Sequence, residues 1–339
     1  MIRVRAPMRI DFAGGWTDVP TFAEREGGLV VNAAVSLRVH VEVIRGGTTI
    51  RLRAEDLKEH VTIASAGHIT YDRKLDLHKA ALNMLPVTGG IEILSRSDAP
   101  AGSGLGASGA LDVALAAGLA RCREEDYSPT ELAEFGFFLE AEELKLLGGR
   151  QDQYAAALGG FHELAFARDD VRARSLAVDR AAAEDLAGHL LLVYTGESHF
   201  SSRTHEYVWS AYAAGEDGVV RALREIRGLA GDAAAAIEAG DWRALAGVLD
   251  ANWRAQQRLH PSIATPAVQR TEAAARGAGA WGVKATGAGA GGCMAILGPA
   301  RARAAIADAV TAAGGRVLAF AFDFDGVVVG EVEDAGYHA

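Results

Sequence analysis

The sequence has little cysteine and no long apolar run. Cys122 and Cys293 are the only cysteines among 339 residues, and they lie far apart. They exclude a disulfide framework and a cysteine-rich zinc site, as is typical of a protein from a reducing cytosol. No apolar run approaches the roughly 20 residues that a membrane span needs, and residues 1–7 lack the apolar centre of a signal peptide. We therefore expect a cytoplasmic protein without a membrane partner.

The sequence also has fewer basic than acidic residues. Lys and Arg together number 34 against 44 Asp and Glu, which gives a net charge of −10. This balance argues against nucleic acid as a main partner, and any phosphate must be bound by local positive groups. Half of the residues are hydrophobic. That is enough for a large core, and the length favours two domains over one.

Strands and helices are mixed without a regular βαβ alternation, which favours an α+β fold over a doubly wound sheet. Ser128 and Glu131 have the spacing of a capping box, which predicts the start of a helix. The polar segment 169–185 is our candidate for the region between the domains. The clearest expected elements are strands at residues 2–12, 29–43, 161–166, 293–297 and 317–324 and helices at 111–123 and 128–147.

Two glycine runs, residues 102–109 and 287–292, can bring the backbone close to an anion. Each contains G-x-G-x-x-G, the pattern of a dinucleotide-binding loop. In that fold the glycines follow their strand directly and an acidic residue ends the next strand, and neither condition is met around residues 102–109. The Walker A pattern is absent, so an ordinary P-loop enzyme is not expected.

The stretch 322–327 reads Phe-Asp-Phe-Asp-Gly-Val, which resembles the nucleophile motif of haloacid-dehalogenase phosphatases. That motif begins its domain, because the other catalytic parts follow it. Only fourteen residues follow Asp325 here. We therefore interpret the stretch as a terminal edge strand with charged turn residues.

Four segments make chemical sense together. Residues 7–18 predict a strand that enters a Gly-Gly turn carrying Trp16, Thr17 and Asp18. An indole, a hydroxyl and a carboxylate on one tight turn suit a sugar, which offers hydroxyl pairs and an apolar face. The other three segments are the glycine run 102–109, residues 148–154, and the run that begins at Lys284.

With these motifs in this order, the chain resembles the GHMP small-molecule kinases, which include galactokinase, homoserine kinase and mevalonate kinase. The resemblance spans essentially the whole chain. It implies an α+β fold of two domains, which we place at residues 1–180 (ribosomal S5-like, with the nucleotide loop) and 181–339 (ferredoxin-like). The active site then lies between them. Residues 148–156 are most similar to the D-glycero-D-manno-heptose 7-phosphate kinases, with the fucokinases as near relatives. Residues 194–196 and 200–202 also fit that subgroup.

The resemblance assigns roles to individual residues. Asp152 matches the aspartate that takes the substrate hydroxyl proton, and Arg9 matches the basic residue that steadies the transferred phosphoryl group. Ser108 and Glu140 match the ligands of Mg²⁺, with Glu143 as the alternative to Glu140. The ATP-binding residues implied are Pro100, Gly102, Ser103, Gly104, Leu105, Gly106, Ala107, Ser108, Thr286, Gly287 and Gly289. The sugar-binding residues implied are Gly14, Gly15, Trp16, Thr17, Asp18, Asn32, Gln153 and Tyr154.

Two departures from the family pattern are visible. Ala107 and Gly109 flank Ser108 where the family often has Ser-Ser-Ala, so one hydroxyl is lost while the magnesium ligand is retained. Ala290 stands where many members have glycine. Neither departure removes a group that the chemistry needs.

The expected function is ATP-dependent, Mg²⁺-dependent phosphorylation of a sugar, at the anomeric hydroxyl of a heptose 7-phosphate. The alternatives are a fucokinase-like or galactokinase-like enzyme on an unphosphorylated sugar, and a catalytically silent sensor. A mevalonate-type decarboxylase does not suit the sugar-type first motif. The candidates for binding a phosphate on the substrate are His199, Arg203, His205 and Lys284. Monomer and homodimer both stay open.

Overall fold

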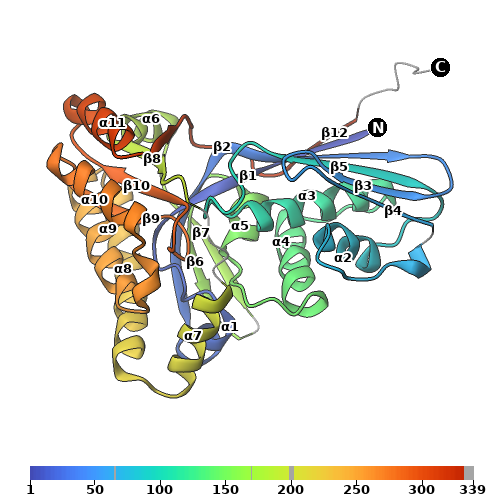
Figure 1. The fold of residues 1–339 in the computed structure, drawn as a ribbon, viewed down its shortest axis with the longest axis horizontal. Coiled ribbons are helices and arrows are strands. Elements are labelled where there is room, and N and C mark those ends of the chain that lie inside the picture. The colour runs from blue at the N-terminus through green and yellow to red at the C-terminus, as the bar shows by residue number, and fades with distance from the viewer. Residues whose placement is uncertain (65, 169, 198–201, 332–339) are drawn as a thin grey trace.

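The computed structural model describes residues 1–64, 66–168, 170–197 and 202–331. Two sheets with their helices lie side by side along the long axis of the molecule (Figure 1). The glycine-rich loops lie where the two parts meet. An α+β fold was expected, and the mixed, largely antiparallel pairing agrees with it.

The first sheet has eight strands and is organised around two long ones, β1 (Ile2–Ala13) and β2 (Gly28–Arg45). Its path runs β12-β1-β2-β5-β3-β4, and β6 and β7 extend it from the other half of β2. All pairings are antiparallel except that of β3 with β5. The other strands are β3 (Ile50–Ala54), β4 (Glu59–Ile63), β5 (Ile91–Ser97), β6 (Phe161–Phe166), β7 (Val171–Ser175) and β12 (Val328–Glu331).

One face of this sheet is covered by helices (Figure 1). The central one, α3 (Ala107–Cys122), packs against β1 and β2 and against neighbouring helices, so nearly all of its side chains are buried. This burial explains why the sequence of α3 is apolar all round rather than amphipathic. Its neighbours are α2 (Asp76–Met84), α4 (Pro129–Phe138) and α5 (Gln151–Leu158). The short helix α1 (Pro20–Glu26) follows the Gly-Gly turn.

The second sheet is antiparallel, in the order β11-β8-β10-β9. Its strands are β8 (Leu190–Tyr194), β9 (Gly282–Ala285), β10 (Cys293–Leu297) and β11 (Arg316–Leu318). The accompanying helices are α6 (Arg180–His189), α7 (Ser202–Ala213), α8 (Asp217–Glu238), α9 (Trp242–Gln257), α10 (Pro266–Gly277) and α11 (Arg303–Ala312). The long helix α8 also packs on β1 and β2 of the first sheet, which ties the two parts together.

The chain returns to the first sheet near its end. Strand β12 pairs with β1, and Asp323 is buried in an ion pair with Arg38 of β2. The second carboxylate oxygen of Asp323 accepts the backbone N–H groups of Asp325 and Gly326. Asp323 is thus a structural turn residue rather than a nucleophile. The division of the chain into two domains at residue 180 stays a prediction. It did not include the return of β12 to the first sheet.

Two expected elements are wrong in extent. The helix expected over 128–147 ends as an α-helix at Phe138 and continues as a short π-helical turn, η2 (Leu139–Glu143). Such a turn is typical of functional sites, and here it carries Glu140. The strand expected over 317–324 is regular only in β11, because the chain then leaves the second sheet for the first. Within the described residues, no helix combines the length and the apolar character of a membrane span.

Candidate active site

Arg9 and Asp152, 143 positions apart in the sequence, are in direct contact. The Nε and Nη2 atoms of Arg9 both lie 2.8 Å from Oδ1 of Asp152. Arg9 comes from the middle of β1 and is almost fully buried, whereas a quarter of the Asp152 side chain is exposed. Asp152 is the second residue of α5. Its carboxylate is therefore held by a helix and can still be reached from solvent.

The same guanidinium joins the two glycine loops. Its Nη1 atom donates to the carbonyl oxygens of Gly104, at 2.6 Å, and Thr286, at 2.8 Å. The Thr286 hydroxyl also lies within hydrogen-bond distance of the Gly104 oxygen, at 3.1 Å. Arg9 therefore fixes the catalytic aspartate candidate relative to both loops.

Glycine is required where the loops touch. Gly102, Gly104 and Gly106 have φ values of 69°, 71° and 76°, a region that L-residues rarely adopt. A Cβ atom on Gly287 would lie 2.9 Å from the Gly104 oxygen. The backbone N–H of Cys293 reaches the Ser103 oxygen at 2.7 Å, so the second sheet is bonded directly to the first glycine loop.

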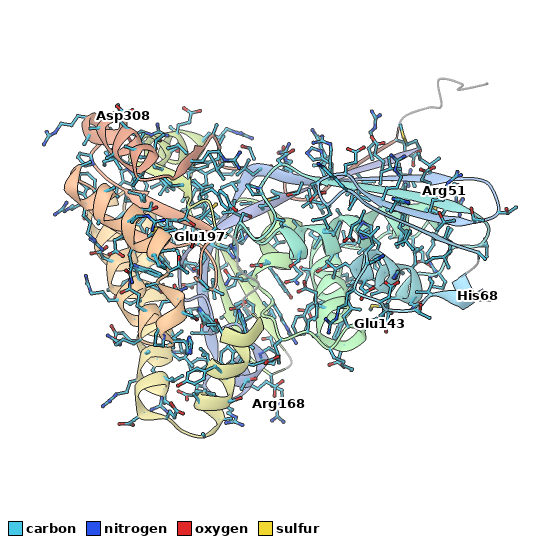
Figure 2. All side chains as sticks on the ribbon, viewed as in Figure 1. Arg51, His68, Glu143, Arg168, Glu197 and Asp308 are labelled. Carbon is cyan, nitrogen blue, oxygen red and sulfur yellow. The ribbon has the colours of Figure 1, made fainter. Side chains whose placement is uncertain are left out.

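The loop leads into the N-terminus of α3 at Ala107, where unpaired N–H groups and the helix dipole favour a phosphate. The buried Ser103 hydroxyl has no partner among the described residues. Figure 2 shows Glu197 at the junction of the two parts, and its carbonyl oxygen accepts the N–H of Gly292 in the second loop. The backbone cradle fits phosphate groups.

The candidate magnesium ligands lie next to this cradle. Ser108 is exposed on the first turn of α3, and its hydroxyl hydrogen-bonds to Glu140. Burial raises the pKa of Glu140 to about 7, the Ser108 hydrogen bond opposes this, and the charge of Asp152 adds to it. A divalent cation would offset the cost of keeping this carboxylate ionised. The hydroxyl and carboxylate oxygens fit Mg²⁺, which takes few protein ligands beside phosphate oxygens.

Glu140 lies in the π-helical turn η2. Gln153 donates to its Oε2 atom at 3.1 Å. Glu143, the alternative ligand, is instead bonded to the Tyr71 hydroxyl on the molecular surface, and Figure 2 labels it on the outer side of the helices. The geometry thus favours Glu140 over Glu143 as the candidate ligand.

Sequence reasoning missed Asp112. This residue is completely buried in the middle of α3, where the side chains of Glu140 and Gln153 act on its carboxyl group. Burial raises its pKa well above the ordinary range, and the nearby Glu140 carboxylate adds to this. The available signal was a single acidic residue inside the apolar run 111–119, which is unusual because a buried charge is costly.

The sugar-site candidates of the first motif lie on one tight turn. The Thr17 hydroxyl donates to the Gly14 oxygen at 2.7 Å and so fixes the turn. Asp18 reaches α5, where its Oδ2 atom accepts the N–H of Gln151 at 3.1 Å. Burial raises the pKa of Asp18 to about 6, and the charge of Asp152 adds to it. Asp18 therefore accepts a backbone N–H from the residue that precedes Asp152, at the start of the helix that carries Asp152.

The remaining sugar-site candidates differ in their surroundings. Asn32 donates to the Gln151 oxygen at 3.3 Å, and its own Oδ1 atom is buried without a partner in the described part of the chain. Tyr154 is buried, and its hydroxyl donates a hydrogen bond to Oε1 of Glu134 at 2.6 Å. This contact directs Tyr154 away from Asp152 and toward α4.

The phosphate candidates are less favourable than expected. Lys284 is fully buried, and its Nζ atom lies 2.8 Å from Oδ2 of Asp11. Burial also lowers its pKa, although Asp11 opposes the shift. Burial lowers the pKa of His205 to about 4, so this ring is neutral at physiological pH. His199 and the side chain of Arg203 lie outside the described residues.

Comparisons with known proteins agree with this geometry. Residues 74–160 match the family model for the N-terminal domain of GHMP kinases, and residues 233–316 match the model for their C-terminal domain. The chain is 29% identical over 305 residues to D-glycero-alpha-D-manno-heptose 7-phosphate kinase from Campylobacter jejuni, covering 86% of this chain and 88% of that one.

Two further relatives are more distant. A bifunctional fucokinase/GDP-fucose pyrophosphorylase from Arabidopsis thaliana is 24% identical over 319 residues, which cover 87% of this chain and only 30% of that enzyme. The crystal structure of a D-glycero-D-manno-heptose 1-phosphate kinase from Bacteroides thetaiotaomicron superposes with a TM-score of 0.82 at 24% identity, covering 98% of this chain and all of the other. It confirms the two-domain fold. The chain therefore belongs to the GHMP kinases and is a sugar kinase.

Proposed function

We propose that this kinase transfers the γ-phosphoryl group of ATP, with Mg²⁺, to the anomeric hydroxyl of D-glycero-D-manno-heptose 7-phosphate. The product is then the 1,7-bisphosphate. The observation that carries the proposal is the contact of Arg9 with Asp152 and with both glycine loops. This contact supports the proposal because it holds one carboxylate and one guanidinium together beside both glycine loops.

The proposed chemistry assigns one task to each group. Asp152 accepts the proton of the anomeric hydroxyl as the new P–O bond forms and the bond to the ADP oxygen breaks. Arg9 holds that carboxylate and supplies positive charge beside the transferred phosphoryl group. Ser108 and Glu140 would hold Mg²⁺, which neutralises charge on the phosphates when bound. Asp18 and Asn32 would hold sugar hydroxyls.

The choice of heptose 7-phosphate rests on the relative from Campylobacter jejuni, whose name specifies that substrate and which aligns along most of both chains. It also rests on the similarity of residues 148–156 to that subgroup. The fucokinase alternative has support from the Arabidopsis thaliana relative, at lower identity. The same site would serve either substrate, because the reacting group is an anomeric hydroxyl in both.

A panel of sugars tests the proposal. ADP release is measured with heptose 7-phosphate, the free heptose, L-fucose and D-galactose, and the product is identified by phosphorus NMR. We expect the highest kcat/KM with heptose 7-phosphate and a new anomeric phosphate signal. A higher kcat/KM with L-fucose would overturn the assigned substrate, and nucleotide binding without turnover of any sugar would indicate a silent sensor.

The role of Asp152 is tested by Asp152→Asn, which retains an oxygen for Arg9 but cannot take a proton. Loss of a general base lowers kcat by about 10²- to 10⁴-fold. Asp323→Asn is the matched control, since Asp323 is also paired with an arginine, Arg38, but lies away from the site. We expect it to lower stability and leave kcat within twofold. Full activity of Asp152→Asn would refute the assignment.

A further inference from the structure

Three aromatic rings meet between the Gly-Gly turn and helix α7. The indole of Trp16 stacks on the imidazole of His205, with ring centroids 4.4 Å apart and an angle of 23° between the planes. Trp209, one turn further along α7, lies 5.9 Å from the same indole in a tilted arrangement. The contact joins a turn of the first sheet to a helix of the second part, next to α1 (Figure 1).

The backbone of Trp16 is strained. Its φ is 80°, a conformation that is unusual for any bulky side chain and costs of order 1–3 kcal/mol. Strain of this kind persists where the surrounding structure over-determines it, and such positions cluster at functional sites. The neighbouring residues on the turn are Thr17 and Asp18, and Asp18 contacts the helix that carries Asp152.

The rings have polar atoms without partners. Trp16 Nε1, Trp209 Nε1 and His205 Nδ1 are all buried, and none has a hydrogen-bond partner among the described residues. Each unpaired buried group costs about 1–3 kcal/mol. A cluster that served packing alone would be more stable with phenylalanine in place of these rings. A ligand that supplies hydroxyl groups would satisfy the nitrogen atoms and explain their presence.

Resting on the proposed function, we propose that Trp16 and His205 form the wall of the acceptor site that recognises uncharged hydroxyl groups of the sugar. The indole N–H donates to one hydroxyl oxygen. The neutral imidazole, which has one donor and one acceptor nitrogen, bonds a second through Nδ1. A neutral ring of this kind can bond to hydroxyl groups of the sugar without needing a charged partner.

The test separates the hydrogen bond from the ring stacking. His205→Phe keeps an aromatic ring on Trp16 and removes Nδ1, whereas His205→Asn places an amide near the position of Nδ1 and removes the ring. Trp16→Phe removes only the indole N–H among the polar groups. Tyr207→Phe is the matched control, because Tyr207 lies on the same helix but is exposed and contacts His260 instead.

KM for the sugar and for ATP, and kcat, are measured with whichever panel sugar the wild-type enzyme uses best, and the sugar Kd is measured by calorimetry. We expect His205→Phe and Trp16→Phe each to raise the sugar KM about tenfold, as the loss of one hydrogen bond implies. KM for ATP and kcat should stay within twofold. His205→Asn should recover most of the sugar affinity, and the control should not change it.

Three results would overturn the inference: an unchanged sugar KM in both ring variants, an equal rise in the KM for ATP, or no advantage of His205→Asn over His205→Phe. A thermal unfolding midpoint within a few degrees of wild type excludes general damage. The assignment of the substrate is tested by a separate outcome. If the wild-type enzyme prefers L-fucose while the ring variants still raise its KM, only the heptose assignment is wrong.

Discussion

Asp18→Asn is expected to stabilise the free protein and to weaken sugar binding. Asp18 is almost completely buried, and burial raises its pKa from 3.8 to about 6. The folded protein therefore binds more protons than the unfolded chain between these pH values. Stability falls as pH rises through this window, and the penalty is complete above about pH 6 and absent below about pH 3.8.

The size of the effect follows from the shift. A difference of one pKa unit corresponds to about 1.4 kcal/mol, so the ionised Asp18 costs about 3 kcal/mol at pH 8 and about half of that at pH 5. An asparagine carries no charge and can still accept the N–H of Gln151. Gln151 Nε2 lies 3.5 Å from Oδ1 of Asp18, and if the Gln151 amide turns over, its Oε1 atom, which is buried without a partner in the described structure, can accept from the asparagine amide.

Urea unfolding of Asp18→Asn and wild type, without ligands, checks this reasoning. The variant should be more stable by about 3 kcal/mol at pH 8 and by about 1.5 kcal/mol at pH 5. Its sugar KM should rise about 10- to 100-fold, because hydrogen bonds to a charged group contribute about 1.5–3 kcal/mol. A gain that is the same at both pH values would refute the electrostatic argument, and an unchanged sugar KM would refute the assignment of Asp18 to the acceptor site.

Much of the fold could be predicted from local sequence. The strands over 161–166 and 293–297 were expected with their exact bounds, since each is a short run of strand-forming residues between glycines or polar turns. The capping box of Ser128 and Glu131 is present with both of its hydrogen bonds. Local signals of this kind act within a few residues and do not depend on the rest of the chain.

Features that depend on distant contacts could not be predicted. The end of α4 at Phe138 is set by packing around η2, because the sequence continues with good helix-forming residues. The return of β12 to β1 follows from pairing across the whole chain length. The buried pair of Lys284 and Asp11 appears in the sequence as two ordinary charged residues, and only the fold shows that neither is free.

The candidate site lies between these extremes. The motif order identified the segments that meet, and the structure brings Arg9, Asp152 and the glycine loops together as that order implied. Asp112 was missed because its raised pKa depends on burial, which periodicity cannot reveal inside a helix that is apolar on all sides. The aromatic contact of Trp16 with α7 was missed for a similar reason, since residues 16 and 205 share no local pattern.

Two further substitutions test how the parts of the enzyme are joined. Lys284→Met leaves the Asp11 carboxylate buried without its cation, and we expect a loss of about 3–5 kcal/mol in urea unfolding; a loss below about 1 kcal/mol would show that the pair does not hold the two sheets together. Arg9→Lys keeps the positive charge, but one ammonium group cannot contact Asp152 and at the same time bridge the carbonyl oxygens of both loops as the planar guanidinium does. The loops and the carboxylate should then lose their common position, with a fall in kcat/KM of about 100-fold, equivalent to about 2.7 kcal/mol, which is in the range of one lost hydrogen bond to a charged group. Steady-state ADP release measures this, and a value within threefold of wild type would mean that charge alone, and not the bridging geometry of Arg9, supports the reaction.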